Sequence, residues 1–154
     1  MKQIDRRPFG KTGETVPALS GGAAPFTLEA ADENIAAARR AVDLGVNYFD
    51  TSPMYGWGES QQVLGRALAE ISDPVFVATK LGHFKERTHY RDVDAITEQL
   101  HDNLRELGRN HVDLLQIHEG DWAGWWNDEE HGLGAVSPNE NTDFTDAPIM
   151  HVLR

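Results

Sequence analysis

The sequence predicts a parallel α/β fold, because β-rich and helical segments alternate along the chain. Short β-rich runs end at Asp50, Lys80 and His118, and each run follows a segment with helical periodicity. Successive run ends lie roughly 30 to 40 residues apart, which is the length of a βα unit. Parallel strands need such long crossover connections, so this order favours a parallel sheet or a barrel over an antiparallel fold.

Residues 7–19 predict a small hairpin that precedes the alternation. Two groups of turn residues, Pro8-Phe9-Gly10 and Lys11-Thr12-Gly13-Glu14, lie between short apolar pieces. The segment 20–25, SGGAAP, then predicts a loop of small residues. Such a loop is either a plain connector or a place where another group approaches the backbone closely, and the local sequence leaves both interpretations open.

Three segments have the apolar spacing of amphipathic helices. The first begins at Asp32 and ends at Gly45, the second follows the loop 56–60, and the third begins near Asp92 and ends at Gly108. The β-rich runs after them are 46–50, 75–79 and 112–117. We expect these helical residues to face a core: Ile35, Ala38, Ala41, Val42, Val63, Leu64, Ala67, Leu68, Val93, Ile96, Leu100, Leu104 and Leu107.

Residues 119–145 break the alternation and contain Trp122, Trp125 and Trp126. A segment of more than about 15 residues without periodicity is usually functional or disordered in a compact domain, and the tryptophans favour function. Residues 145–154 then begin like a helix, with Pro148 in its first turn. Because that helix has no end signal, we expect residues 1–154 to be part of a longer single domain.

The composition excludes several classes of function. The 154 residues include no cysteine, so disulfides, thiol catalysis and thiolate metal sites are excluded, which suits the cytoplasm. The formal net charge of −11 repels nucleic acid and anionic lipid. No apolar run approaches the roughly 18 residues of a membrane span. We therefore expect a cytoplasmic protein that binds neither nucleic acid nor membrane.

The candidate functional residues follow from where the β-rich runs end. In parallel α/β folds ligands bind at the carboxyl ends of the strands, so Asp50, Lys80 and His118 should converge there. Tyr55 follows the first run closely and should join them. Each residue alone has an ordinary structural role, as a helix cap, a solvated strand end, a core imidazole or a packing ring. Their joint placement favours a site that moves protons.

Several motifs resemble those of the aldo-keto reductase family. They occur in order along residues 6–118 and are GVNYFDTS (45–52), YG with GES and LG (55–65), ATK (78–80), VDLLQIH (112–118) and FGKTG before VP (9–17). The resemblance implies a TIM-type (β/α)8 barrel, of which this chain would supply about the first four βα units and an N-terminal hairpin. It also implies NADP(H), with NAD(H) as the alternative, and a small-molecule carbonyl or sugar substrate that is reduced or oxidised.

The resemblance implies catalytic roles for Asp50, Tyr55, Lys80 and His118. A hydride that reaches a carbonyl carbon leaves charge on the oxygen, and a nearby acid must supply a proton. A phenol is a weak acid at neutral pH, and the Lys80 ammonium would favour its ionised form. We expect Tyr55 to be the general acid and base, Asp50 to orient Lys80, and His118 to hydrogen-bond the substrate oxygen.

Cofactor and substrate contacts follow less directly from the resemblance. Gly22, Ala23 and Asp50 correspond to the family's nicotinamide side, although the match at 21–23 is loose. The loop residues Trp57, Trp122 and Trp125, with His118, should line the substrate mouth, unless the tryptophans only pack the long loop 119–145 onto the barrel. The remaining histidines are scattered without ligand spacing, so we expect no metal site.

The second half of the family's barrel has no counterpart in this sequence. Its four strands would come from the same gene or from another chain. The resemblance implies that much of the cofactor site lies in that half, so the fragment alone is expected to be inactive, and an open half-barrel would also expose sheet edges. A binding or regulatory subunit on the same barrel is the alternative function. The presence of both Tyr55 and Lys80 favours an enzyme.

Overall fold

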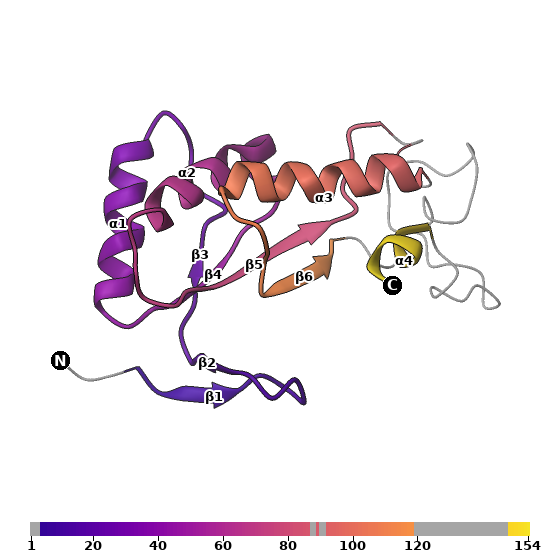
Figure 1. Ribbon diagram of the computed structural model, residues 1–154. Helices are drawn as coiled ribbons and strands as arrows, with labels where there is room; N and C mark the ends of the chain where they lie inside the picture. Colours follow the sequence, from indigo (N-terminus) through magenta and orange to yellow (C-terminus); the bar gives the residue numbers. More distant parts are fainter. Residues whose placement is uncertain (1–3, 87–88, 90–91, 119–147) are drawn as a thin grey trace. The chain divides into compact units, whose positions relative to one another are not determined.

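A computed structural model describes residues 4–86, 89, 92–118 and 148–154 (Figure 1). The chain divides into two compact units. The first comprises Met1–Lys80 and Asn103–Gln116, and the second comprises Leu81–Asp102 and Ile117–Arg154. The hydrophobic core cluster and the residues Asp50, Tyr55 and Lys80 lie in the first unit.

The predicted N-terminal hairpin is confirmed. Strands β1 (Arg6–Pro8) and β2 (Thr15–Pro17) pair antiparallel, and the Phe9 amide donates to the Glu14 carbonyl at 2.8 Å across the turn. The Phe9 ring packs edge-on against the ring of Phe76, with centroids 5.8 Å apart. This aromatic contact joins the hairpin to the strand that begins at Phe76, within the first unit.

A four-stranded sheet with the order β3-β4-β5-β6 forms the centre of the fold (Figure 1). Its strands are β3 (Gly21–Gly22), β4 (Tyr48–Asp50), β5 (Phe76–Leu81) and β6 (Leu114–Ile117). The pairs β3-β4 and β4-β5 are parallel. The predicted alternation of parallel strands and helices is therefore confirmed.

The prediction for the small-residue segment needs correction. Gly21 and Gly22 form the first strand of the sheet instead of a loop that follows it. A Cβ atom at Gly21 would lie 2.6 Å from the Phe49 ring. Only glycine lets β3 approach β4 this closely, and the lack of β-forming side chains hid the strand from sequence patterns.

The helices follow the predicted segments, but the predicted loop 56–60 is wrong, because a 3-10 turn spans Tyr55–Gly58 and the second main helix already begins at Glu59. They are α1 (Ala31–Asp43), the short 3-10 helix η1 (Tyr55–Gly58), α2 (Glu59–Leu68), α3 (Val93–Leu107) and α4 (Pro148–Leu153). Asp92 accepts hydrogen bonds from the amides of Asp94 and Ala95, which confirms the start of α3. Val93 is 41% exposed, so its predicted core position is wrong. As the first residue of its helix, it precedes the buried stripe.

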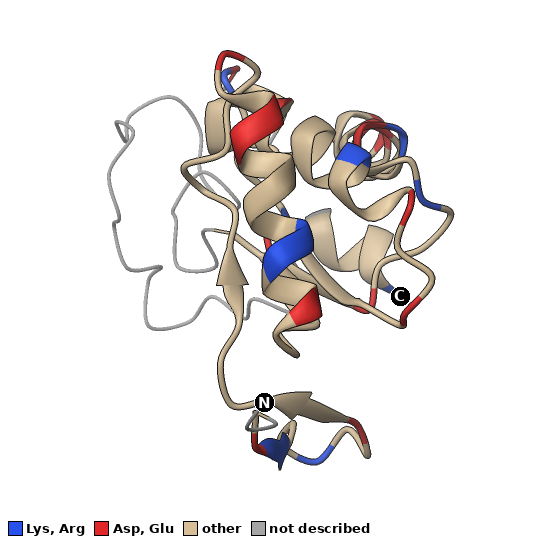
Figure 2. Cartoon of the chain, turned by 90° about the vertical axis from the view of Figure 1, so that its left-hand side faces the viewer, with Lys and Arg blue, Asp and Glu red and all other residues tan. Residues whose placement is uncertain are grey.

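Helix α1 has the charge arrangement that stabilises a surface helix. Its first turn contains Asp32 and Glu33, and its last turn contains Arg40, which complements the helix dipole. Arg39 forms an ion pair with Glu70 at 2.9 Å. Figure 2 shows both signs of charge along this helix. Exposed pairs of this kind contribute at most about 1 kcal/mol each, so burial must supply most of the stability.

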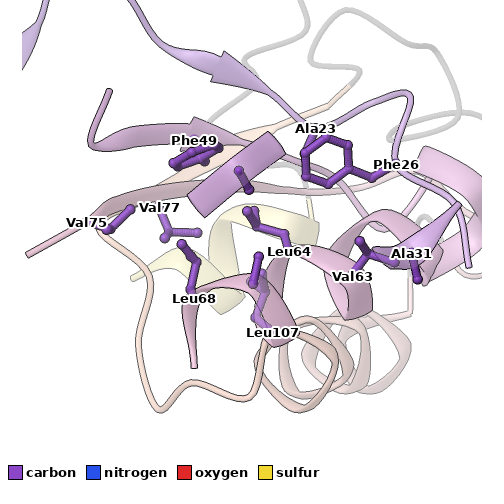
Figure 3. Packing of buried hydrophobic residues seen from close by; sticks show 12 residues of the cluster. Ala23, Phe26, Ala31, Phe49, Val63, Leu64, Leu68, Val75, Val77 and Leu107 are labelled. Carbon is purple, nitrogen blue, oxygen red and sulfur yellow. The ribbon is translucent and has the colours of Figure 1, made fainter. Parts of the chain in front are cut away.

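The core packs the helices against one face of the sheet (Figure 3). Phe49 and Val77 project from adjacent strands into this cluster and are 2% and 0% exposed. The predicted helix positions Ala38, Val63, Leu64, Ala67, Leu68 and Leu107 are all buried in it. Since side chains alternate along a strand, Asp50 and Lys80 belong to the opposite face.

The predicted active-site loop 119–145, with Trp122, Trp125 and Trp126, lies outside the described residues. Pro148 is the first residue of α4, as its place in a first turn predicts. Within the described ranges, the structure contains no helix with the length and apolarity needed to cross a membrane.

Gly65 offers a test of this packing, because a Cβ there would lie 2.6 Å from the Leu107 carbonyl oxygen. We expect Gly65→Ala to lower the free energy of unfolding by about 1–3 kcal/mol through overpacking against rigid backbone. The measurement is urea denaturation. Gly22→Ala is the matched control, because a Cβ at Gly22 meets nothing within 4 Å. Equal unfolding midpoints for the two variants would contradict the close approach of α2 to the end of α3.

Candidate active site

Lys80 and Asp50 form a close ion pair at the carboxyl ends of β5 and β4. Lys80 Nζ lies 2.6 Å from Asp50 Oδ1 and donates a second hydrogen bond to the Thr51 carbonyl at 2.8 Å. The Lys80 side chain is only 13% exposed. The strand register explains the pair, because Asp50 lies opposite Ala78, and Lys80 follows two residues later on the same face.

Tyr55 lies beside this ion pair, at the start of η1. Its ring centroid is 4.7 Å from Lys80 Nζ, which is within the range of a cation–π contact. The Tyr55 amide donates to the Ser52 carbonyl at 3.1 Å, which fixes the turn between β4 and η1. The structure thus brings together three of the four predicted catalytic residues: Asp50, Tyr55 and Lys80.

The turn after Tyr55 has an unusual backbone. Gly56, Trp57 and Gly58 have φ angles of 59°, 50° and 98°. A bulky residue rarely adopts a positive φ, and such strain is concentrated at functional sites. Trp57 is 51% exposed, which suits its predicted role as a substrate contact.

A second tyrosine, Tyr48, lies two residues before Asp50. Burial raises the pKa of the Tyr48 phenol above its ordinary value of 10.0, and the Asp50 carboxylate raises it further. The Tyr48 ring packs on Phe76 with centroids 4.9 Å apart. Tyr48 is therefore a packing residue that stays protonated.

Two buried hydroxyls, which were not among the predicted site residues, connect the end of β3 to this site. Ser60 Oγ donates to the Ala23 carbonyl at 2.7 Å and lies 2.7 Å from Thr51 Oγ1. The Ala23 amide donates to the Asp50 carbonyl at 2.9 Å, and Gly22 lies opposite Asp50 in the sheet. The predicted cofactor residues Gly22, Ala23 and Asp50 are therefore adjacent. The motif residues Thr51 and Ser60 were the available sequence signal.

His118 lies in the second unit, directly after β6. Its amide donates to the Leu81 carbonyl at 2.7 Å. Its ring lies 5.5 Å from the His83 ring, centroid to centroid, at an interplanar angle of 50°. The role of His118 toward a substrate oxygen stays a prediction.

The described part of the chain contains no group of three or more His, Cys, Asp or Glu residues that could hold a metal ion. The predicted substrate residues Trp122 and Trp125 lie outside it.

A buried amide network, made of Thr79, Gln61, Asn103 and Glu106, lies on the helix side of β5. Thr79 Oγ1 donates to Gln61 Oε1 at 2.6 Å. Gln61 Nε2 donates to Asn103 Oδ1 at 3.0 Å and to Glu106 Oε2 at 2.6 Å. Thr79, Gln61 and Asn103 are all 0% exposed. No sequence pattern predicted this network, because its members come from three separate elements.

Glu106 is the ionisable member of the buried amide network. Burial raises the pKa of its carboxyl above the ordinary value of 4.5, and the Gln61 hydrogen bond and the Arg105 charge oppose this shift. The net direction is upward. The folded protein therefore binds this proton more tightly than the unfolded chain does.

The fold and the site define a parallel α/β protein with a lysine–aspartate–tyrosine cluster at the carboxyl ends of its strands. A family model described as the aldo/keto reductase family matches residues 19–130. The chain belongs to the aldo/keto reductase family.

Known relatives agree with this assignment. The chain is 36% identical to L-galactose dehydrogenase from Arabidopsis thaliana over 126 residues, which cover 77% of this chain and 39% of that protein. It is 29% identical to pyridoxal 4-dehydrogenase from Microbacterium luteolum over 152 residues, covering 77% of this chain and 44% of that protein. The chain thus spans about two fifths of the length of the curated relatives it matches.

The solved structures confirm the predicted fold class. An aldo-keto reductase from Bacillus halodurans in its holo form matches with a TM-score of 0.66 at 26% identity, covering 75% of this chain and 40% of that one. The family fold is a (β/α)8 barrel, and this chain has a hairpin and a four-stranded sheet, in which β3, β4 and β5 pair in parallel.

The raised pKa of Glu106 predicts how stability depends on pH. The free energy of unfolding should fall as pH rises through the range above 4.5, because the unfolded chain releases this proton first. Glu106→Gln removes that loss and keeps an acceptor for Gln61. We therefore expect the variant to gain stability, relative to the native sequence, as pH rises from about 4 to about 7.

Urea denaturation at a series of pH values measures this effect. Glu29→Gln, at an exposed carboxyl, is the control and should show no comparable gain. If the pH dependence of Glu106→Gln matched that of the native sequence, the assignment of Glu106 as a destabilised buried carboxylate would be wrong.

Proposed function

We propose that this chain forms part of an NAD(P)H-dependent oxidoreductase that interconverts aldehydes or ketones and alcohols, with Tyr55 as the proton carrier. The position of the Lys80 ammonium, 2.6 Å from Asp50 and 4.7 Å from the Tyr55 ring centroid, is the observation that carries this proposal. A part-buried cation beside a phenol can stabilise the negative charge that develops on the phenol oxygen while a proton is transferred.

Asp50, Lys80 and Tyr55 have different roles in the proposed proton transfer. Asp50 and the Thr51 carbonyl hold the ammonium in place, so that it does not have to leave its site during the reaction. In the reductive direction Tyr55 gives its proton to the substrate oxygen, and in the oxidative direction it takes the proton back. The Lys80 charge stabilises the phenolate in both directions.

The residues at the end of β3 fit a flat ring laid against the backbone. Gly22 is exposed, and no atom lies within 4 Å of the point where its Cβ would be. Ala23 is buried and its backbone groups bond to Asp50 and Ser60, so it supports this surface from behind. We propose that Gly22 and Asp50 contact the nicotinamide of NADP(H) or NAD(H). When bound, that group supplies the hydride.

We further propose that His118 hydrogen-bonds the substrate oxygen and that Trp57, Trp122 and Trp125 line the substrate mouth. The exposure of Trp57 next to the Tyr55 turn supports its part in this proposal. The two curated relatives are named for L-galactose and pyridoxal, which favours a small polar aldehyde, ketone or sugar as the substrate class. The remaining strands of the barrel would come from the same gene or from another chain.

Tyr55→Phe tests the central assignment in the complete barrel. Without the hydroxyl we expect turnover of aldehydes and aldoses to fall by about 10²–10⁴-fold, because the proton donor is lost. The change in nicotinamide absorbance measures turnover, and quenching of protein fluorescence measures cofactor binding, which should persist.

Tyr48→Phe is the matched control, because it removes a phenol hydroxyl from a packing residue. It should keep most of the turnover. Undiminished turnover in Tyr55→Phe would show that Tyr55 is not the proton carrier.

A further inference from the structure

The distance between Lys80 and Tyr55 depends on two segments, β5 and η1, that are remote in the sequence. We propose that the buried amide network acts as a positioning device that holds the end of β5 against the Tyr55 turn. Gln61, Asn103, Thr79 and Glu106 would thus be positioning residues for the Lys80–Tyr55 contact. The inference rests on the proposed function only in assuming that this contact matters for proton transfer.

The network forms hydrogen bonds with β5 at Thr79 and at the backbone of Lys80 itself. Asn103 Nδ2 donates to the Lys80 carbonyl at 2.9 Å. Thr79, the residue before Lys80, donates from its hydroxyl to Gln61. Thr79 faces the helices while Lys80 faces the other side of the sheet. The network therefore fixes the Lys80 backbone from the face of the sheet opposite to the ammonium.

Gln61 is the centre of the network and has a single satisfactory orientation. Its Oε1 accepts from Thr79, and its Nε2 donates to both Asn103 and Glu106. Reversing the amide would place its oxygen against two other oxygens, Asn103 Oδ1 and Glu106 Oε2, and both of the present hydrogen bonds to these atoms would be lost. Gln61 therefore links β5 rigidly to α2 and to the end of α3.

The other end of the network abuts the Tyr55 turn. A Cβ atom at Gly58 would lie 2.3 Å from Glu106 Oε1. Gly58 is the last residue of η1, has a φ of 98°, and directly precedes α2, which contains Gln61. A continuous set of contacts thus runs from the Lys80 carbonyl through Asn103, Gln61 and Glu106 to the turn that begins at Tyr55.

This arrangement exceeds what stability alone requires. Buried apolar side chains would fill the same space between β5, α2 and α3 without demanding a fixed orientation. A fully satisfied polar network instead specifies one relative placement of the elements it joins. Here the network joins β5, which bears Lys80, to α2 and α3, and α2 directly follows the turn that begins at Tyr55.

An NMR measurement of geometry tests the proposal in the full chain. Lysine is labelled with 13C at its ε-carbon, and the chemical shift of the Lys80 ε-methylene group is measured. The Tyr55 ring should move this signal upfield. The Tyr55→Leu variant gives the chemical shift without the ring. We expect Thr79→Val and Asn103→Leu each to remove half or more of the upfield shift. Thr79→Ser keeps the hydroxyl and should retain the shift.

Val63→Ala is the control for a loss of stability without a change in the network, because Val63 is 0% exposed and lies on the same helix as Gln61. It should retain the shift. In the complete barrel, Thr79→Val should lower kcat on the order of tenfold with little change in KM, since misplacement affects the chemical step.

If the Lys80 shift in Thr79→Val equals that in Thr79→Ser and in Val63→Ala, the network only stabilises the fold and the proposal is overturned. Should Asn103→Leu fail to fold, the two Thr79 variants decide the question without it. The NMR result does not depend on turnover. Retained turnover in Tyr55→Phe would therefore overturn the proposed function while leaving the positioning role to be judged on geometry.

Discussion

The ion pair between Lys80 and Asp50 is the interaction on which the candidate site depends. Removing an ammonium from water costs several kcal/mol, and the carboxylate at 2.6 Å with the Thr51 carbonyl at 2.8 Å offsets that cost. The pair exists only because β4 and β5 are parallel and in one register. A slip of one residue would turn one of the two side chains toward the core, where it would lack its partner.

The packing behind the sheet shows how a polar site is held by a mostly apolar core. Phe49 and Val77 fix the strands through burial, which acts without direction. Orientation comes from the few buried polar groups. The Ser60 and Thr51 hydroxyls tie β3 to β4, and the buried amide network ties β5 to α2 and α3. Glycines at 21, 58 and 65 permit the close approaches that these bonds require.

Sequence reasoning succeeded where the signal was local. Hydrophobic spacing located the three main helices, turn residues located the hairpin, and strand ends located Asp50 and Lys80. It failed for β3, whose two glycines have no strand propensity of their own and pair only because β4 lies beside them. Val93 was assigned to the core because spacing ignores the exposed start of a helix. The left-handed Trp57 has no signal in the order of residue types.

The sequence by itself determined the alternation of strands and helices, the family and the residue types able to move a proton, because periodicity and motif spacing are written along the chain. The tertiary structure decided which of these groups meet. It set Lys80 against Asp50 and over the Tyr55 ring, and it joined Thr79, Gln61, Asn103 and Glu106 behind them. Such contacts depend on strand register and helix packing, which only the folded chain fixes.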